Sequence, residues 1–89
     1  MANKPKYNVY LYFTTCTLAE AITEINIMLE QAGYPLISEN NYVNCQPSDH
    51  GEDWFDDYDF TFKTEIQDDK NTINKKLSDV CMSFDINND

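Results

Sequence analysis

Residues 7–15, Tyr-Asn-Val-Tyr-Leu-Tyr-Phe-Thr-Thr, alternate between two faces. One face is large and apolar, and it consists of Tyr7, Val9, Leu11 and Phe13. The other face has Tyr10 and Tyr12 between polar residues, so the pattern predicts a strand in the centre of a sheet. We interpret Tyr10 and Tyr12 as structural residues beneath a helix or a second subunit. The alternative is a stacking pair on the surface.

Residues 17–32 predict a helix with signals at both ends. Thr17 and Glu20 have the spacing of a capping box, and Gly33 followed by Pro35 ends the helix. The apolar residues of this helix keep a helical spacing and form one buried stripe: Leu18, Ala21, Ile22, Ile25, Met28, Leu29 and Ala32. This helix is expected to cover the sheet.

The rest of the chain predicts a hairpin, a second clear strand and a second helix. Residues 34–45 form the hairpin around Asn40-Asn41, because Asn tolerates the left-handed conformation of tight turns. Residues 58–66 alternate and place four side chains inward: Tyr58, Phe60, Phe62 and Ile66. Asp68-Asp69 then begins a helix whose apolar stripe is Ile73, Leu77, Val80, Cys81 and Phe84.

These elements predict one α+β domain over residues 1–89, with flexible ends at residues 1–6 and 86–89. An antiparallel sheet of three to four strands carries two helices, in the order β-α-β-β-β-α. The order is β-α-β-β-α if residues 34–45 do not form a hairpin. The strand–helix–strand beginning also suits a split-βαβ arrangement.

The composition is strongly acidic, with 16 Asp and Glu against 6 Lys, no Arg and a formal net charge of -10. Hydrophobic residues make up 42% of the chain, so the acidity does not imply disorder. This charge excludes nucleic acid or an anionic membrane surface as the main partner and favours a basic protein. The alternative interpretation is that the charge only keeps a small domain soluble.

No segment has the length of a signal peptide or of a membrane span, so we expect a cytoplasmic protein. Cys16, Cys45 and Cys81 are odd in number and include no Cys-x-x-Cys pair. This pattern predicts reduced, partly buried thiols that serve as packing residues.

Acidic residues are most concentrated in residues 49–59, which hold six carboxylates and no Lys. Trp54 and Phe55 lie among them, and we interpret these two as anchors to the core, with direct partner contact as the alternative. Carboxylates two apart on the following strand are about 6.6 Å apart, close to the spacing of successive phosphates. Glu20 and Glu24 extend the acidic surface onto the first helix without a Lys to pair with them.

No catalytic or cofactor-binding pattern is present in the sequence. His50 is the only His, and it has neither zinc-site spacing nor a nucleophile to activate. Two glycines cannot build a phosphate-binding loop. We therefore expect no enzyme activity, no cofactor and no structural metal, while a weak divalent-cation site in residues 49–59 stays open.

In its small size, strong acidity and lack of Arg, the whole chain resembles phage-encoded DNA-mimic proteins, and most of all the Arn anti-restriction proteins of T-even phages. The resemblance implies an inhibitor that evades host defence in the bacterial cytoplasm. Its partner would be the basic DNA-binding surface of a host restriction nuclease or nucleoid protein. A homodimer is also implied, with Tyr10, Tyr12 and Ile27 as candidate contacts. A band of lysines departs from a wholly acidic surface: Lys70, Lys75 and Lys76.

A rigid array of carboxylates can occupy a cleft that binds DNA through Lys and Arg. The residues expected to take the place of phosphates are Glu20, Glu24, Asp49, Glu52, Asp53, Asp56, Asp57, Asp59, Glu65, Asp68 and Asp69. The alternative is an acidic interaction module, for example an inhibitor of a CRISPR effector or another host enzyme, that does not compete with DNA. A third hypothesis is a small structural or host-takeover protein whose charge is incidental.

Overall fold

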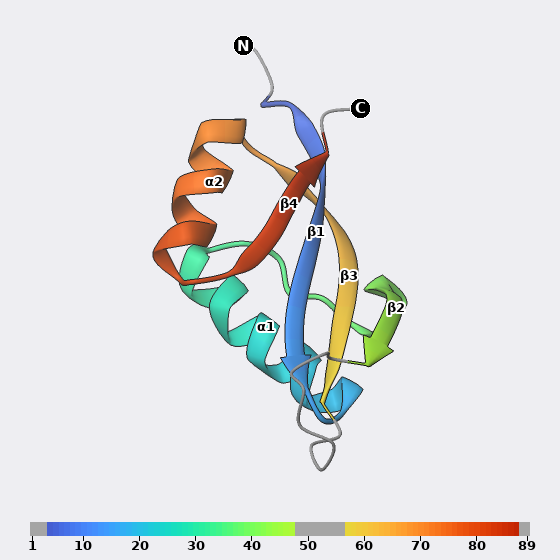
Figure 1. Cartoon of the computed structure of the whole chain (residues 1–89). Coiled ribbons are helices and arrows are strands. Elements are labelled where there is room, and N and C mark those ends of the chain that lie inside the picture. Colours follow the sequence, from blue (N-terminus) through green and yellow to red (C-terminus); the bar gives the residue numbers. More distant parts are fainter. Residues whose placement is uncertain (1–3, 48–56, 88–89) are drawn as a thin grey trace.

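The computed structural model describes residues 4–47 and 57–87 and confirms the α+β fold (Figure 1). The strands are β1 (Lys6–Thr15), β2 (Tyr42–Pro47), β3 (Tyr58–Gln67) and β4 (Ser83–Asn87). The helices are α1 (Leu18–Ala32) and α2 (Lys70–Asp79), with a short 3-10 helix, η1 (Glu39–Asn41), before β2. Within these ranges no helix combines the length and apolar content needed to cross a membrane.

The sheet has the order β2-β3-β1-β4, and every neighbouring pair is antiparallel. β1 is central, as its two-faced pattern predicted, and Leu11 lies opposite Phe62 of β3 and Phe84 of β4. β1 and β2 run parallel with β3 between them, and α1 connects them. β3 and β4 likewise run parallel with β1 between them, and α2 connects them. The connectivity is therefore a pair of interlocked split-βαβ units.

Both helices pack on the same face of the sheet (Figure 1). The fully buried side chains of this layer come from the sheet and from both helices: Val9, Leu11, Phe62, Ala21, Ile25, Leu29, Ile73 and Leu77. The apolar stripe predicted for α1 is thus confirmed. Because both helices lie on one side, neither covers the opposite face of the sheet.

The predicted ends of α1 are also confirmed, although only the Thr17 half of the capping box is formed. The Thr17 hydroxyl accepts a hydrogen bond from the Glu20 backbone N–H (3.2 Å) and donates to the Glu20 carboxylate (3.1 Å). Gly33 has a φ of 82°, and the Tyr34 N–H donates to the Leu29 carbonyl (2.9 Å). A left-handed Gly with this bond pattern is a Schellman ending, which satisfies carbonyls that the helix leaves unpaired.

The hairpin predicted around Asn40-Asn41 is wrong. Asn41 belongs to η1, and its side chain accepts from the Ser38 N–H (2.9 Å) and donates to the Lys63 carbonyl (2.9 Å). The preceding segment does not pair as a strand, because the Asn26 side chain bonds both the N–H (2.8 Å) and the carbonyl (3.0 Å) of Ile37. The Asn26 side chain thus satisfies the two backbone groups of Ile37 that a paired strand would have satisfied in a hairpin.

The second helix is shorter than predicted: Ile73 and Leu77 are buried in α2 as expected, but the rest of the predicted stripe lies beyond this helix. α2 ends at Asp79, Cys81 takes a left-handed φ of 61°, and residues 83–87 form β4. Phe84 and Ile86 pack against the core from β4, so residues 86–87 are not a loose tail. At the other end, Lys4 is held by an ion pair to Asp68.

The three cysteines are exposed, so the prediction that they are packing residues is wrong. Cys81 occupies the turn between α2 and β4, where its N–H donates to the Ser78 carbonyl (3.0 Å). Its left-handed backbone is strained for any residue with a Cβ.

We therefore expect Cys81→Gly to be more stable than Cys81→Ala by about 1 kcal/mol, because only Gly adopts this φ without strain. Urea unfolding of both variants measures the difference. The site is exposed, so lost packing contributes little to either value. An alanine variant as stable as the glycine variant would contradict the assigned turn.

Candidate functional site

The net negative charge of the protein comes from one segment of the sequence. Between Leu11 and Phe62 the sequence has ten carboxylates and no Lys. The six lysines lie outside this segment, where the remaining six Asp and Glu balance them. We call residues 11–62 the acidic segment and residues 4–10 with 63–87 the lysine end. The whole formal charge of -10 is that of the acidic segment.

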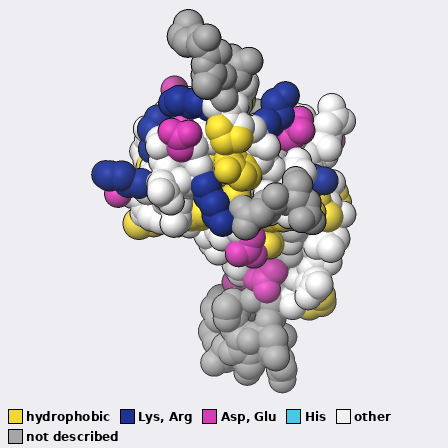
Figure 2. Space-filling view, turned by 90° about the horizontal axis from the view of Figure 1, so that it is seen from above, with side chains coloured by type: hydrophobic (Ala, Val, Ile, Leu, Met, Phe, Trp, Pro, Cys, Tyr) yellow, Lys and Arg dark blue, Asp and Glu magenta, His cyan; other side chains and the backbone are white. Residues whose placement is uncertain are grey.

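In the central strand pair, this division along the chain is also a division along the sheet. Leu11 and Phe62 lie opposite each other in the β1–β3 pairing, and the next pair is Tyr10 with Lys63. The Lys63 ammonium lies 5.9 Å from the centre of the Tyr10 ring and marks the boundary. Figure 2 views the molecule from above, and there lysines and carboxylates are interspersed. In the other half of this strand pair, residues 11–15 with 58–62, the one charged side chain is that of Asp59.

Three of the predicted site residues meet where β1 leads into α1. Thr14 donates to the Asp59 carboxylate, Thr15 donates to Glu20 (3.3 Å), and the Cys16 thiol donates to Asp57 (3.3 Å). Hydroxyls and a thiol donate hydrogen bonds without bringing positive charge. These carboxylates are therefore held in position while their charge remains available to a partner.

The other predicted residues are not gathered with these three. Glu24 is exposed one turn further along α1, and Glu65 and Asp69 are exposed at the lysine end. Four predicted carboxylates and the two predicted aromatic anchors lie outside the described residues: Asp49, Glu52, Asp53, Asp56, Trp54 and Phe55.

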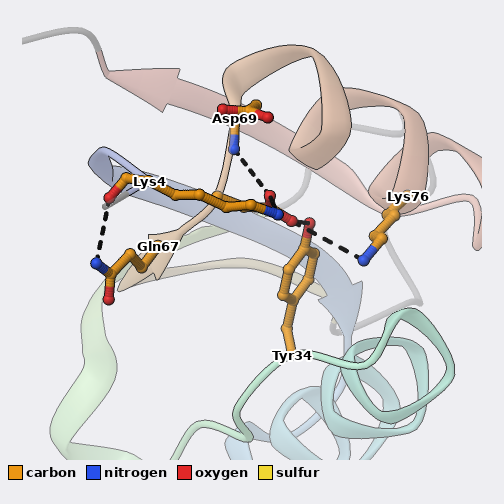
Figure 3. A network of polar contacts seen from close by, with 6 residues as sticks. Lys4, Tyr34, Gln67, Asp69 and Lys76 are labelled. Atoms are coloured by element: carbon orange, nitrogen blue, oxygen red, sulfur yellow. Dashed lines mark hydrogen bonds and ion pairs between the residues drawn. The ribbon is translucent and has the colours of Figure 1, made fainter. Parts of the chain in front are cut away.

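Asp68 requires a correction, because it is only 4% exposed and does not present a free carboxylate to a partner. Its two oxygens accept from Lys4 (2.9 Å), from the Asp69 backbone N–H (2.9 Å) and from the Tyr34 hydroxyl (3.0 Å). Lys76 lies 3.9 Å away, so three segments converge on one carboxylate (Figure 3). The hydrogen bond from Lys4, followed by the backbone N–H, holds the pKa of Asp68 below its usual value.

The helices leave one face of the sheet open (Figure 1), so the helix predicted to cover Tyr10 and Tyr12 is wrong, while cover by a second subunit stays a prediction. Tyr10 and Tyr12 are half-buried on this face, and no helix covers them in the described part of the chain. The Tyr12 hydroxyl donates to Asp85 of β4 (2.8 Å). Burial and then this hydrogen bond raise the pKa of Tyr12 to about 12. The sequence analysis missed Asp85, because it had not identified β4.

The described residues contain no group of three or more His, Cys, Asp or Glu side chains placed to hold a metal ion. What the arrangement offers chemically is unpaired negative charge on a folded surface, flanked by aromatic rings. Such a surface attracts cationic side chains and repels phosphate.

Comparisons with protein-family models, with curated proteins and with solved structures found no match to this chain.

The Asp68 network yields a prediction about stability and pH. We expect Asp68→Asn to lower the melting temperature by several degrees at pH 7, because it removes a buried charge from its paired cations. Asp69→Asn is the matched control, since its exposed side chain makes no capping bond and the charge change is the same.

The sign of the pH effect follows from the lowered pKa of Asp68. The stabilisation is fully present above the unfolded-state pKa of about 3.9 and is lost as the pH falls through the folded-state value. Thermal melts between neutral and acid pH should therefore show the two variants converging below about pH 4. A gap that stayed constant over this range would assign the effect to packing and not to charge.

Proposed function

We propose that the protein is a DNA mimic that binds the basic DNA-binding surface of a host protein and inhibits it. The observation that carries this proposal is the acidic segment, with ten carboxylates and no Lys or Arg between Leu11 and Phe62. A protein that binds DNA gains much of its affinity by neutralising phosphates with Lys and Arg. Carboxylates concentrated in one segment without Lys or Arg can bind the same cations.

The positions of the carboxylates support this function over charge that only maintains solubility. A solubilising surface usually mixes both signs, and the lysine end of this molecule does so. In the acidic segment, Glu20, Asp57 and Asp59 accept hydrogen bonds from hydroxyl and thiol donors, and none of the ion pairs found among the described residues involves them. Self-repulsion of that kind costs stability, and binding to a basic partner would relieve it.

The surface that we propose is narrower than the set predicted from the sequence. It consists of the predicted carboxylates within the acidic segment: Glu20, Glu24, Asp49, Glu52, Asp53, Asp56, Asp57 and Asp59. Glu65 and Asp69 are left out because they lie at the lysine end, and Asp68 because it is buried. A restriction nuclease or a nucleoid protein is the class of partner that we propose.

The first experiment is a pull-down from a bacterial lysate on the immobilised protein, with duplex DNA as competitor and across a salt series. A captured DNA-binding protein that both DNA and salt release would support mimicry. A partner that stays bound under both conditions would overturn it.

Paired variants then test whether the acidic segment makes the contact. We expect Glu20→Gln with Glu24→Gln to weaken binding of the captured partner about tenfold at low salt, because each exposed charge pair is worth up to about 1 kcal/mol. Asp69→Asn with Asp79→Asn removes the same charge from the lysine end and should change affinity little. Isothermal calorimetry at two salt concentrations measures both. Equal losses would mean that total charge matters and its position does not.

One observation favours the interaction module that does not compete with DNA. Tyr42 and Val43 of the edge strand β2 are 37% and 46% exposed, and Leu36 before η1 is 58% exposed. β2 itself carries no charged residue. Binding through such apolar contacts would resist salt and DNA in the pull-down, so the same experiment separates the two functions.

A further inference from the structure

We propose that the open face of the sheet receives arginine side chains of the basic partner, with Tyr10 and Tyr12 as stacking surfaces. Asp59 and Asp85 supply the counter-charges on either side. This inference rests on the proposed function and deepens it, because it joins Asp59 to the two tyrosines and adds Asp85, which the sequence analysis had missed.

The register of the sheet places these four residues on one face. Asp85 of β4 is opposite Tyr10, and Asp59 of β3 is opposite Thr14, so the two carboxylates lie on opposite sides of β1. From Tyr10 to Thr14 is about 13 Å along β1, and β3 and β4, the two neighbours of β1, are about 10 Å apart. Tyr12 lies between the two carboxylates and donates its hydroxyl to Asp85 at 2.8 Å.

The tyrosine rings are held in place yet remain partly accessible. Both are half-buried by their neighbours in the sheet, and the helices lie on the other side. The bond to Asp85 fixes the Tyr12 ring, which reduces the entropy lost when a partner stacks on it. Arginine suits this arrangement, because its planar guanidinium stacks on an aromatic face while it bonds a carboxylate.

Aromatic residues on an exposed sheet are also used to stack nucleic-acid bases. Here Asp59 and Asp85 flank the rings and would repel phosphates, so a nucleic-acid strand is the disfavoured occupant. Charge complementarity selects a cationic protein segment instead.

The chain's own Lys63 already uses this site in part. Its ammonium lies 5.9 Å from the centre of the Tyr10 ring, within the range of a cation–π interaction. An incoming arginine must displace the Lys63 ammonium from the Tyr10 ring, and the two positive charges repel each other. Removing Lys63 should therefore strengthen binding at the face beyond what the loss of one positive charge explains.

The test uses the full chain and a short oligo-arginine peptide as the probe, with NMR chemical shifts and affinity as readouts. We expect the largest shifts at Tyr10, Tyr12 and Asp85, and small shifts along α1. Lys63→Gln should tighten binding about threefold and Asp85→Asn should weaken it about threefold.

The matched controls are Lys75→Gln and Asp79→Asn, which make the same charge changes at an ion pair on α2 (3.5 Å). They should change affinity much less than their counterparts on the sheet. Equal effects of each variant and its control would overturn the proposal, and so would shifts confined to α1. The mapping on the unmodified chain decides the question even if Asp85→Asn unfolds the protein.

The two proposals can fail separately. If DNA releases the captured partner but the peptide shifts map to α1, mimicry stands and the sheet-face assignment fails. If the peptide binds the sheet face but DNA does not displace the partner, the cation site stands and mimicry fails.

Discussion

The buried carboxylate of Asp68 sets the condition that the rest of the molecule must satisfy. A charge that is 4% exposed is costly unless cations and hydrogen-bond donors meet it. Those partners come from three separate segments: Lys4 before β1, Tyr34 after α1, and Lys76 on α2. Satisfying one carboxylate therefore brings the beginning of the chain, the end of α1 and the second helix together at the lysine end.

The same requirement helps to explain where the positive charge lies. Two of the six lysines are committed to Asp68, and Lys75 pairs with Asp79 on the same helix. The acidic segment has no Lys or Arg, and neutral donors position three of its carboxylates where β1 leads into α1. Lysines at the lysine end therefore form ion pairs that stabilise the fold, whereas Asp57 and Asp59 in the acidic segment are held by neutral donors.

Much of the fold could be predicted from the sequence where periodicity and end signals agree. The alternation of residues 7–15 and the capped stripe of residues 17–32 each pointed to one structure. The C-terminal region did not, because Leu77, Val80, Cys81 and Phe84 have helical spacing although Phe84 lies in β4. The burial of Asp68 could not be predicted either, since it depends on Lys4 and Tyr34, which are distant in sequence. Of the site, Glu20, Asp57 and Asp59 were foreseen, whereas Asp85 needed β4.

The connectivity links these observations to function. Two split-βαβ units place both helices on one face, so the strict alternation of β1 sends Leu11 into the core and Tyr12 to the opposite face. β4, which the sequence analysis did not predict, brings Asp85 beside Tyr12. The surface where aromatic rings meet unpaired carboxylates is therefore a consequence of the topology. The partner that we propose, a basic DNA-binding surface, would meet both features through arginine, whose planar cation stacks on rings and bonds carboxylates.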